Sequence, residues 1–570
     1  MDQLPKASIA PNEASGYSNH LVGLVYTQTM QILEGKLNNV TLLYLMLLFI
    51  PVYGAYGVYK YRKSYIDLPY VGIPSGPFGS WRAAYTYLHS SADVIWDGYK
   101  KYAREGKAFV VSTPGRWMVF LTDPDQIAEL AMSSDQKIGF YEALTERNKH
   151  GTISEPTLGD YINTYHVDVI KAQLTPRMAS ILPDIRKEGA AAWNDSLKAS
   201  TDTWTRGVVW DIALQVVARS ANRCFIGLPL CRNQELLSIF QEYAIRAAEV
   251  VYIMDISPKI LEPFLGWLLM SRHKLPQRAT KIMEPAFTAR LRMREELGPT
   301  RWETEKPNDA ITWIIDAAAK KDKSQQTIEQ MVWRLMWINF AAIHTTSMST
   351  LYILYDLGAN PEYIEPIRQE MISVMDKYGG YNKEALNNMV KLDSCLRESQ
   401  RWNNVVSVVI SKVTLCDYTF KSGKAPFHIP KGTFVTAPAT ATHFSEDIYG
   451  SDAAIWKGFR FSDVREKMES AEESARLQAT ATSKEYLAFS HGKHACTGRF
   501  FAIYQLKMLL IYCLLRYEFR LPAECGGKRP ENKIILGRRA ADTDGILEFR
   551  ERKEWAELKC RWGDFDEDGE

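Results

Sequence analysis

The sequence predicts a mainly helical protein with a small β region, preceded by a single N-terminal transmembrane helix. Most of the chain after residue 80 carries apolar residues at helical spacing. Two stretches are extended instead and rich in β-branched residues, which favours strands. Near the N-terminus, residues 37–59 carry no formal charge and contain an unbroken apolar stretch from Leu42 to Ile50. These three observations define the expected fold class.

The uncharged segment 37–59 is long enough to cross a bilayer, whose hydrocarbon core takes about 20 apolar residues. Basic residues follow it at once: Lys60, Arg62 and Lys63. This basic excess predicts a cytosolic main domain and a short lumenal tail at residues 1–36. The segment begins too late for a cleaved signal peptide. A buried core helix is the alternative interpretation.

The remaining elements follow in order along the chain. Residues 60–80 form a basic, proline-rich hinge, and residues 81–556 are expected to form one large domain without internal repeats. Within it, the extended stretches 108–121 and 405–435 predict the small sheet. Helices are predicted at residues 201–224, 234–252, 281–295, 329–357, 361–377 and 383–401. Residues 557–570 read as a solvated acidic tail.

Composition gives no sign of a nucleic-acid partner or a zinc site. The 570 residues are 46% hydrophobic and 24% charged, with a net charge of +2. The cysteines are scattered, with no C-x-x-C pair: Cys224, Cys231, Cys395, Cys416, Cys496, Cys513, Cys525 and Cys560. Such scattering suits free thiols in a reducing compartment.

The most informative motif is a glycine-punctuated loop with one cysteine, Phe489-Ser-His-Gly-Lys-His-Ala-Cys496-Thr-Gly498. An apolar helical run through Leu515 follows it directly. A thiolate at Cys496 would lie near a helix N-terminus, where the macrodipole favours negative charge. We expect Gly492 and Gly498 to adopt backbone geometry that a side chain would forbid, and to allow close approach to a flat ligand. A buried structural cysteine after a turn is the alternative.

The pattern F-x-x-G-x-x-x-C-x-G resembles the haem-ligand loop of cytochromes P450. The resemblance implies the P450 fold over residues 69–552 and a haem b whose iron is held by the thiolate of Cys496. It also implies that Phe489 packs against the haem and that Gly498 lies beside it. His494 stands where the family usually has Arg, and it could still donate a hydrogen bond to a haem propionate.

A second motif, Ala341-Ala342-Ile-His344-Thr345-Thr, interrupts an apolar helical run. It resembles A-G-x-[DE]-T-T of the P450 central helix, which implies that Thr345 helps deliver protons during O2 activation. His344 replaces the usual acid and could relay protons, because histidine titrates near neutrality. The alternative is a buried helix whose Thr hydroxyls bond to the carbonyl four residues earlier.

A third motif is Glu398-Ser-Gln-Arg401, in which a carboxylate and a guanidinium share one helix face. Arg460, between two Phe residues, offers a second guanidinium to the same carboxylate. The set resembles the P450 structural triad that holds the core behind the haem, although E-x-x-R alone often marks a solvated pair. By the same resemblance, His166 lies on a helix that contacts a propionate.

The resemblance implies a fungal-type, membrane-anchored monooxygenase of the endoplasmic reticulum that inserts one oxygen atom of O2 into a bulky hydrophobic substrate. The segments that would line its pocket, 246–269 and 404–409, are mostly apolar, which suits a bulky hydrophobic molecule. By resemblance, the A-A-I-H-T-T-S and G-K-H-A-C-x-G-R-F-F-A versions of the two motifs are typical of fungal P450s acting on diterpenes, indole diterpenes and meroterpenoids. We find no nucleotide-binding motif, so electrons would come from NADPH–cytochrome P450 reductase, with cytochrome b5 as a further donor. The docking face would carry four basic residues around the cysteine: Lys493, His494, Arg499 and Lys507.

Two other functions remain open from the sequence. One is a haem-thiolate isomerase or dehydratase that rearranges a peroxide without O2 or a reductase. The other is a non-enzymatic membrane protein that binds haem. Thr345 argues against both, because neither needs a proton-delivering hydroxyl in the central helix.

Overall fold

The computed structural model describes residue 59 and residues 65–75, 79–148, 164–257, 261–271, 273–535 and 538–562. The chain divides after Tyr65, and the compact unit described below begins at Ile66. Apart from Tyr59, the predicted anchor at 37–59 lies outside the described residues. Within the part of the chain that is described, no helix combines the length and the hydropathy of a membrane span.

The main sheet has six strands in the order β1-β2-β3-β9-β6-β4. It joins the two predicted extended stretches: β3 (Arg116–Phe120) pairs in parallel with β9 (Phe434–Ala437), which pairs antiparallel with β6 (Val409–Thr414). The other three strands are β1 (Tyr70–Val71), β2 (Phe109–Thr113) and β4 (Ile138–Gly139). A small sheet from these stretches is therefore confirmed. A hairpin of β7 (Tyr418–Phe420) and β8 (Phe427–Ile429) lies between β6 and β9 in the sequence.

A second sheet, of three strands, is absent from the sequence-based prediction. It contains β10 (Tyr517–Arg520), β13 (Ile546–Glu551) and β5 (Thr205–Val208) in that order. The helix predicted at 201–224 is wrong in its first part. Residues Thr205–Val208 form β5, and α8 (Val209–Phe225) begins only at Val209. Strand β5 is defined by pairing with β13, far along the chain, and local periodicity cannot reveal such a partner. The short strands β11 (Lys533–Ile535) and β12 (Arg538–Ala540) form a further hairpin.

The other predicted helices are present with shifted ends: α9 (Gln234–Ile256), α11 (Leu275–Glu305), α13 (Ile328–Ala359) and α14 (Ile364–Tyr378). The helix predicted at 383–401 is divided into α15 (Lys383–Asn388) and α16 (Val390–Trp402). Glu370 of α14 accepts the backbone N–H groups of Lys391 and Leu392, which caps the N-terminus of α16. A side chain of another helix therefore holds the start of α16.

The remaining α-helices of the described residues are α3 (Gly79–Tyr102), α4 (Pro124–Met132), α5 (Phe140–Asn148), α6 (Tyr165–Val169), α7 (Met178–Ser196), α10 (Glu262–Ser271), α12 (Ala310–Ala318), α17 (Ala439–His443), α18 (Glu446–Tyr449), α19 (Ser462–Arg465), α20 (Ala471–Arg476), α21 (Arg499–Arg516) and α22 (Trp555–Arg561). Helix α22 belongs to the compact unit and extends beyond residue 556, the predicted end of the domain. Its residues Trp555 and Leu558 are buried in that unit. Residues 563–570 of the predicted tail lie outside the described part.

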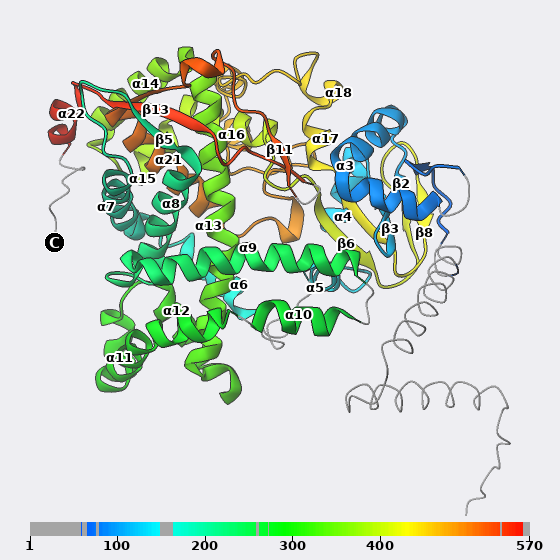
Figure 1. The fold of residues 1–570 in the computed structure, drawn as a ribbon, viewed down its shortest axis with the longest axis horizontal. Coiled ribbons are helices and arrows are strands. Elements are labelled where there is room, and N and C mark those ends of the chain that lie inside the picture. The colour runs from blue at the N-terminus through cyan, green and yellow to red at the C-terminus, as the bar shows by residue number, and fades with distance from the viewer. Residues whose placement is uncertain are drawn as a thin grey trace, which may run out of the picture. The chain divides into compact units, whose positions relative to one another are not determined.

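Helix α13 is the central element of the unit. Figure 1 shows it crossing the middle of the ribbon, with α7 and α8 on one side and α3 with its sheet on the other. Thr327 caps its N-terminus by accepting the backbone N–H of Gln330. The largest apolar cluster gathers buried side chains from α7, α8, α13, α14 and α21. This helical core holds α13 and α21, the two helices that carry the main motifs.

Candidate active site

Cys496 lies in the loop directly before α21, whose first residue is Arg499 and whose N-cap is Gly498. The loop closes on itself, because the amide of Cys496 donates to the carbonyl of Phe489 at 2.9 Å. Burial raises the pKa of the Cys496 thiol, while the backbone N–H groups of Gly498 and Arg499 and the charge of Arg499 lower it. A thiolate here finds N–H donors and a helix N-terminus, as the motif predicts.

The two loop glycines differ in what they provide. Gly492 has a φ of +78°, and an added Cβ would lie 2.6 Å from the carbonyl oxygen of Ala131 in α4. Gly498 has a φ of −84°, which any residue adopts. The predicted need for unusual backbone geometry at Gly498 is therefore wrong. A Cβ there would approach only the Cys496 sulfur, at 3.9 Å, so Gly498 leaves open space beside the ligand atom.

The donor set fits an iron whose other ligands come from a macrocycle. The Cys496 side chain is exposed, yet burial is the largest influence on its pKa. The thiol therefore lines a recess. Protein atoms surround it, which raises its pKa, but they leave its surface uncovered. Among the described residues, no group of three or more His, Cys, Asp or Glu side chains could hold a bare metal ion. One thiolate beside an uncrowded glycine suits haem, which brings its own nitrogen ligands.

The middle of α13 presents a second open surface. Ala341 and Thr345, one helical turn apart, are exposed, whereas Ile343, Thr346 and Ser347 are buried. The Thr345 hydroxyl donates to the carbonyl of Ala341 at 2.7 Å, the predicted bond to the carbonyl four residues earlier. Most residues on either side of this strip are buried or partly buried, so the strip marks a face of the helix that its neighbours leave open.

His344 faces α8 instead of sharing that strip. Its ring centroid lies 6.0 Å from that of Trp210 in α8. Neither ring nitrogen has a hydrogen-bond partner among the described residues. Burial lowers the pKa of His344 to about 4. The prediction that His344 titrates near neutrality is therefore wrong, and the imidazole is neutral at physiological pH.

The structure brings Glu398, Arg401 and Arg460 together. Glu398 and Arg401 are fully buried and joined by two hydrogen bonds of 2.7 and 2.8 Å. Arg460 donates through Nε to the same carboxylate at 3.1 Å, and the backbone N–H of Lys457 adds a bond of 3.0 Å. A bidentate arginine and these further donors compensate a carboxylate that would be costly to bury alone. The cluster holds α16 to the segment around residue 457.

His443 connects this cluster to the cysteine loop, and sequence analysis missed it. Its Nε2 accepts the backbone N–H of Leu487 at 2.8 Å, so the ring proton is on Nδ1, which lies 3.1 Å from the carbonyl of Arg401. Burial lowers the pKa of His443 to about 3, and the nearby Arg401 adds to this. Leu487 lies just before Phe489. A lone histidine in an Ala-Thr-rich segment carries no local signal of this link.

The four basic residues predicted to surround the cysteine do not form one exposed patch. Lys507 is buried, and its Nζ bonds to Asp393 at 2.7 Å and to the carbonyl of Leu386 at 2.8 Å. The prediction that Lys507 serves a docking face is therefore wrong. Lys493 is exposed, and Arg499 is half-buried beside Cys496.

The two histidines predicted near the propionates have protein partners. The Nε2 of His494 lies 2.9 Å from both carboxylate oxygens of Asp135, and its ring stacks on Phe140 at 4.1 Å. This leaves Nδ1 as the ring nitrogen for any propionate. His166 places Nδ1 3.2 Å from Nη1 of the buried Arg334. A propionate contact stays a prediction for both.

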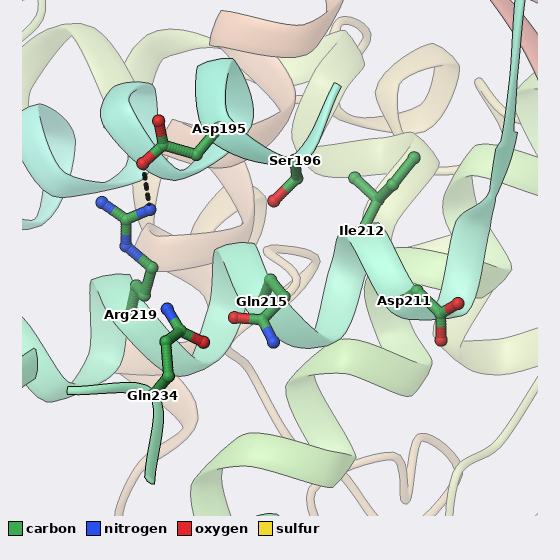
Figure 2. Close-up of a pocket in the computed structure, with 7 residues that line it drawn as sticks. All are labelled: Asp195, Ser196, Asp211, Ile212, Gln215, Arg219 and Gln234. Carbon is green, nitrogen blue, oxygen red and sulfur yellow. Dashed lines mark hydrogen bonds and ion pairs between the residues drawn. The ribbon is translucent and has the colours of Figure 1, made fainter. Parts of the chain in front are cut away.

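A surface hollow of about 270 Å³ lies away from these motifs (Figure 2). Its lining residues come from α7, α8 and the start of α9: Asp195, Ser196, Asp211, Ile212, Gln215, Arg219 and Gln234. Arg219 is occupied by ion pairs with Asp195 at 2.5 Å and with the buried Glu188 at 2.6 Å. The hollow contains none of the residues that the sequence singles out, and it has the character of a structural groove.

Comparison with known proteins agrees with the geometry. The sequence model of the family described as Cytochrome P450 matches residues 74–542. Cytochrome P450 monooxygenase 151 of Postia placenta is 37% identical over 493 residues, which cover 85% of this chain and 95% of that protein. Cytochrome P450 monooxygenase AN1598 of Emericella nidulans is 31% identical over 475 residues, covering 83% and 85%. The chain therefore belongs to the cytochrome P450 family of haem-thiolate monooxygenases.

Proposed function

We propose that this P450 hydroxylates or further oxidises a bulky terpenoid or meroterpenoid intermediate of fungal secondary metabolism. The observation that carries the proposal is the exposed Ala341–Thr345 strip, the face of α13 that its neighbours leave open. Beyond α16, Val406 is 40% exposed, and Val405 and Val408 are partly exposed. Apolar side chains of this kind favour an apolar substrate. The fungal origin of the similar monooxygenases supports the same substrate class.

The chain's own residues have distinct roles in this proposal. Haem, when bound, supplies the O2 chemistry, and the protein positions it and excludes side reactions. Cys496 would hold the iron through its thiolate, with the backbone N–H groups of Gly498 and Arg499 near the sulfur. The Thr345 hydroxyl, oriented by its bond to Ala341, would pass protons along the open face of α13. Neutral His344 faces Trp210 of α8 and not this open face, so its part in the relay stays a prediction. The cluster around Glu398 keeps the scaffold rigid.

We further propose that NADPH–cytochrome P450 reductase supplies the electrons, with cytochrome b5 as a further donor, and that the enzyme is anchored in the endoplasmic reticulum membrane by residues 37–59. Helix α10 supports contact with lipid. Its region exposes four large apolar side chains by 38–65%: Leu261, Phe264, Trp267 and Leu268. Exposed apolar clusters of this kind mark membrane or protein contacts. Removing residues 1–59 should release much of the protein from microsomes with its haem retained; carbonate-resistant association of the shortened chain would contradict a dominant N-terminal anchor.

The ligand assignment is tested by Cys496→Ser with Cys513→Ser as the matched control. Cys513 lies in α21 and is buried. We expect Cys496→Ser to abolish the strongly red-shifted Soret band of the reduced carbon-monoxide complex and Cys513→Ser to retain it. A retained band in the Cys496 variant would contradict the assignment.

The reaction is tested by measuring NADPH and O2 consumption with reductase while candidate terpenoids are converted. We expect both to be consumed in step with an oxygenated product. Conversion without NADPH or O2 would favour the isomerase or dehydratase instead. Haem binding with no conversion of any peroxide or terpenoid would favour a non-enzymatic protein.

A further inference from the structure

Arg499 is a half-buried cation with no carboxylate partner among the described residues. Its Nη1 donates to the carbonyl of Cys496 at 2.9 Å, and its Nε donates to the carbonyl of Thr480 at 3.1 Å. The guanidinium carbon lies 4.5 Å from the centroid of the Phe500 ring. The side chain is therefore tethered to the peptide of the cysteine itself, and only neutral groups tether it.

Two other buried cations around the site are paired with carboxylates: Arg401 with Glu398 at 2.7 Å and Lys507 with Asp393 at 2.7 Å. The buried Arg397 bonds to the carbonyls of Gln478 and Ala481 and lies over the Tyr486 ring. A charge removed from water is costly unless an opposite charge compensates it. For Arg499 the anion at hand is the Cys496 thiolate, because its Nη1 bonds to the carbonyl of that same residue.

We propose that Arg499 is the fixed counter-ion of the Cys496 thiolate, and that its charge sets how strongly the sulfur donates to the haem iron. The proposal rests on Cys496 as the haem ligand. A positive charge beside the sulfur withdraws electron density and favours the reduced state of the bound iron. Arg499 thereby acts through Cys496 as a tuning residue and does not belong to a reductase-docking patch.

The test separates the charge of Arg499 from its hydrogen bonds. Arg499→Gln keeps a donor and loses the charge, whereas Arg499→Lys keeps the charge and loses the guanidinium fork. Lys493→Gln removes an exposed charge from the same loop and is the matched control. The readouts on the haem-loaded protein are the reduction potential and the KM for reductase.

We expect Arg499→Gln to shift the potential to more negative values. Arg499→Lys should stay close to the parent, and Lys493→Gln should leave the potential unchanged. Equal shifts in both Arg499 variants would assign the effect to the hydrogen bonds and overturn the proposal. A raised KM for reductase at an unchanged potential would overturn it in favour of docking.

Three further outcomes are decisive. If Arg499→Gln does not retain haem, the reduction potential of Arg499→Lys tests the proposal instead. A potential equal to the parent's supports the role of the Arg499 charge, and a shift to more negative values contradicts it. Absence of the red-shifted band in the parent would remove the ligand assignment and the proposal together. Loss of product with a normal band and a charge-dependent potential would contradict the proposed substrate chemistry alone and would leave the role of Arg499 supported.

Discussion

Two polar regions in the interior of this P450 are built in opposite ways. Glu398, Arg401 and Arg460 are matched to one another, and Arg401 also donates to the carbonyls of His443 and Ala453 at 2.6 and 2.8 Å. In the middle of α13, the described residues offer no partner to either ring nitrogen of His344 or to the Ser347 hydroxyl. Unpaired buried polar groups reduce stability. The comparison distinguishes a scaffold, whose three ion-paired side chains are satisfied, from a working region, where an imidazole and a hydroxyl are left unpaired.

The hydroxyls of α13 make the same distinction within one helix. Thr345, Ser349 and Thr350 each donate to the carbonyl four residues earlier. Ser347 has the same opportunity but does not use it, although it is fully buried. A hydroxyl and an imidazole one turn apart are therefore free to bond to other groups. The following predictions test whether the two regions differ in function as they differ in structure.

The largest effect is expected at the satisfied cluster. Glu398→Ala leaves the fully buried Arg401 without a carboxylate, while Arg460 keeps Asp452, and breaking a buried pair costs about 3–5 kcal/mol. We expect little folded, haem-containing protein. Glu249→Ala is the control, because Glu249 pairs with Arg246 at the same spacing, at 3.1 Å, on an exposed surface. Its loss should change stability by less than about 1 kcal/mol. Similar unfolding temperatures for the two variants would show that the cluster is not a scaffold.

The second effect concerns pH. The pKa of folded His344, about 4, is below its ordinary value of 6.5. Above pH 6.5 the ring is neutral in both the folded and the unfolded chain, and the stability is fully present. As the pH falls from 6.5 toward 4, the unfolded chain binds a proton that the folded ring does not. The free energy of unfolding therefore decreases by up to about 3 kcal/mol, at 1.36 kcal/mol per pKa unit. His344→Phe should flatten the fall in unfolding free energy between pH 6.5 and 4. The exposed His428→Gln is the control and should retain the parent's slope. Equal slopes in parent and His344→Phe would mean that the ring is hydrated.

The third effect is kinetic. Thr345→Ala removes an exposed hydroxyl with little volume, so haem and substrate binding should persist. Positioned proton transfer contributes roughly 10²–10⁴-fold, and water can replace part of it. We expect slower product formation and more hydrogen peroxide per NADPH. Thr350→Ala is matched, since Thr350 makes the same backbone bond, at 2.9 Å, but is buried. It should affect stability and leave coupling intact; equal coupling in the two variants would remove the assigned role of Thr345.

The smallest effect compares two buried serines. Ser399 donates to Asp356 at 2.6 Å, so Ser399→Ala should lower the unfolding free energy by about 1–3 kcal/mol. Ser347 has no partner among the described residues, so Ser347→Ala should be neutral or stabilising by up to about 1 kcal/mol. Chemical denaturation of both variants measures the difference. Destabilisation by Ser347→Ala would reveal a bound water that satisfies this hydroxyl.

Local patterns in the sequence determined much of this protein. The cysteine loop, the helix that follows it, the central helix and the strands β2, β3, β6 and β9 of the main sheet have signatures within about 30 consecutive residues, because helical and strand periodicity are local properties. The contact of Glu398 with Arg401 likewise follows from their spacing on one helix face.

Only the tertiary structure decided the properties that depend on distant partners. Strand β5 forms because β13 pairs with it, and His443 joins Arg401 to Leu487 across segments that share no motif. The same reason explains Lys507, whose position near Cys496 in sequence hides its burial against Asp393. Burial lowers the pKa of His344, and packing leaves Arg499 without a carboxylate partner among the described residues. Sequence spacing determines which residues share an element, whereas packing determines which charges and hydroxyls are satisfied, and the chemistry of the site depends on the second.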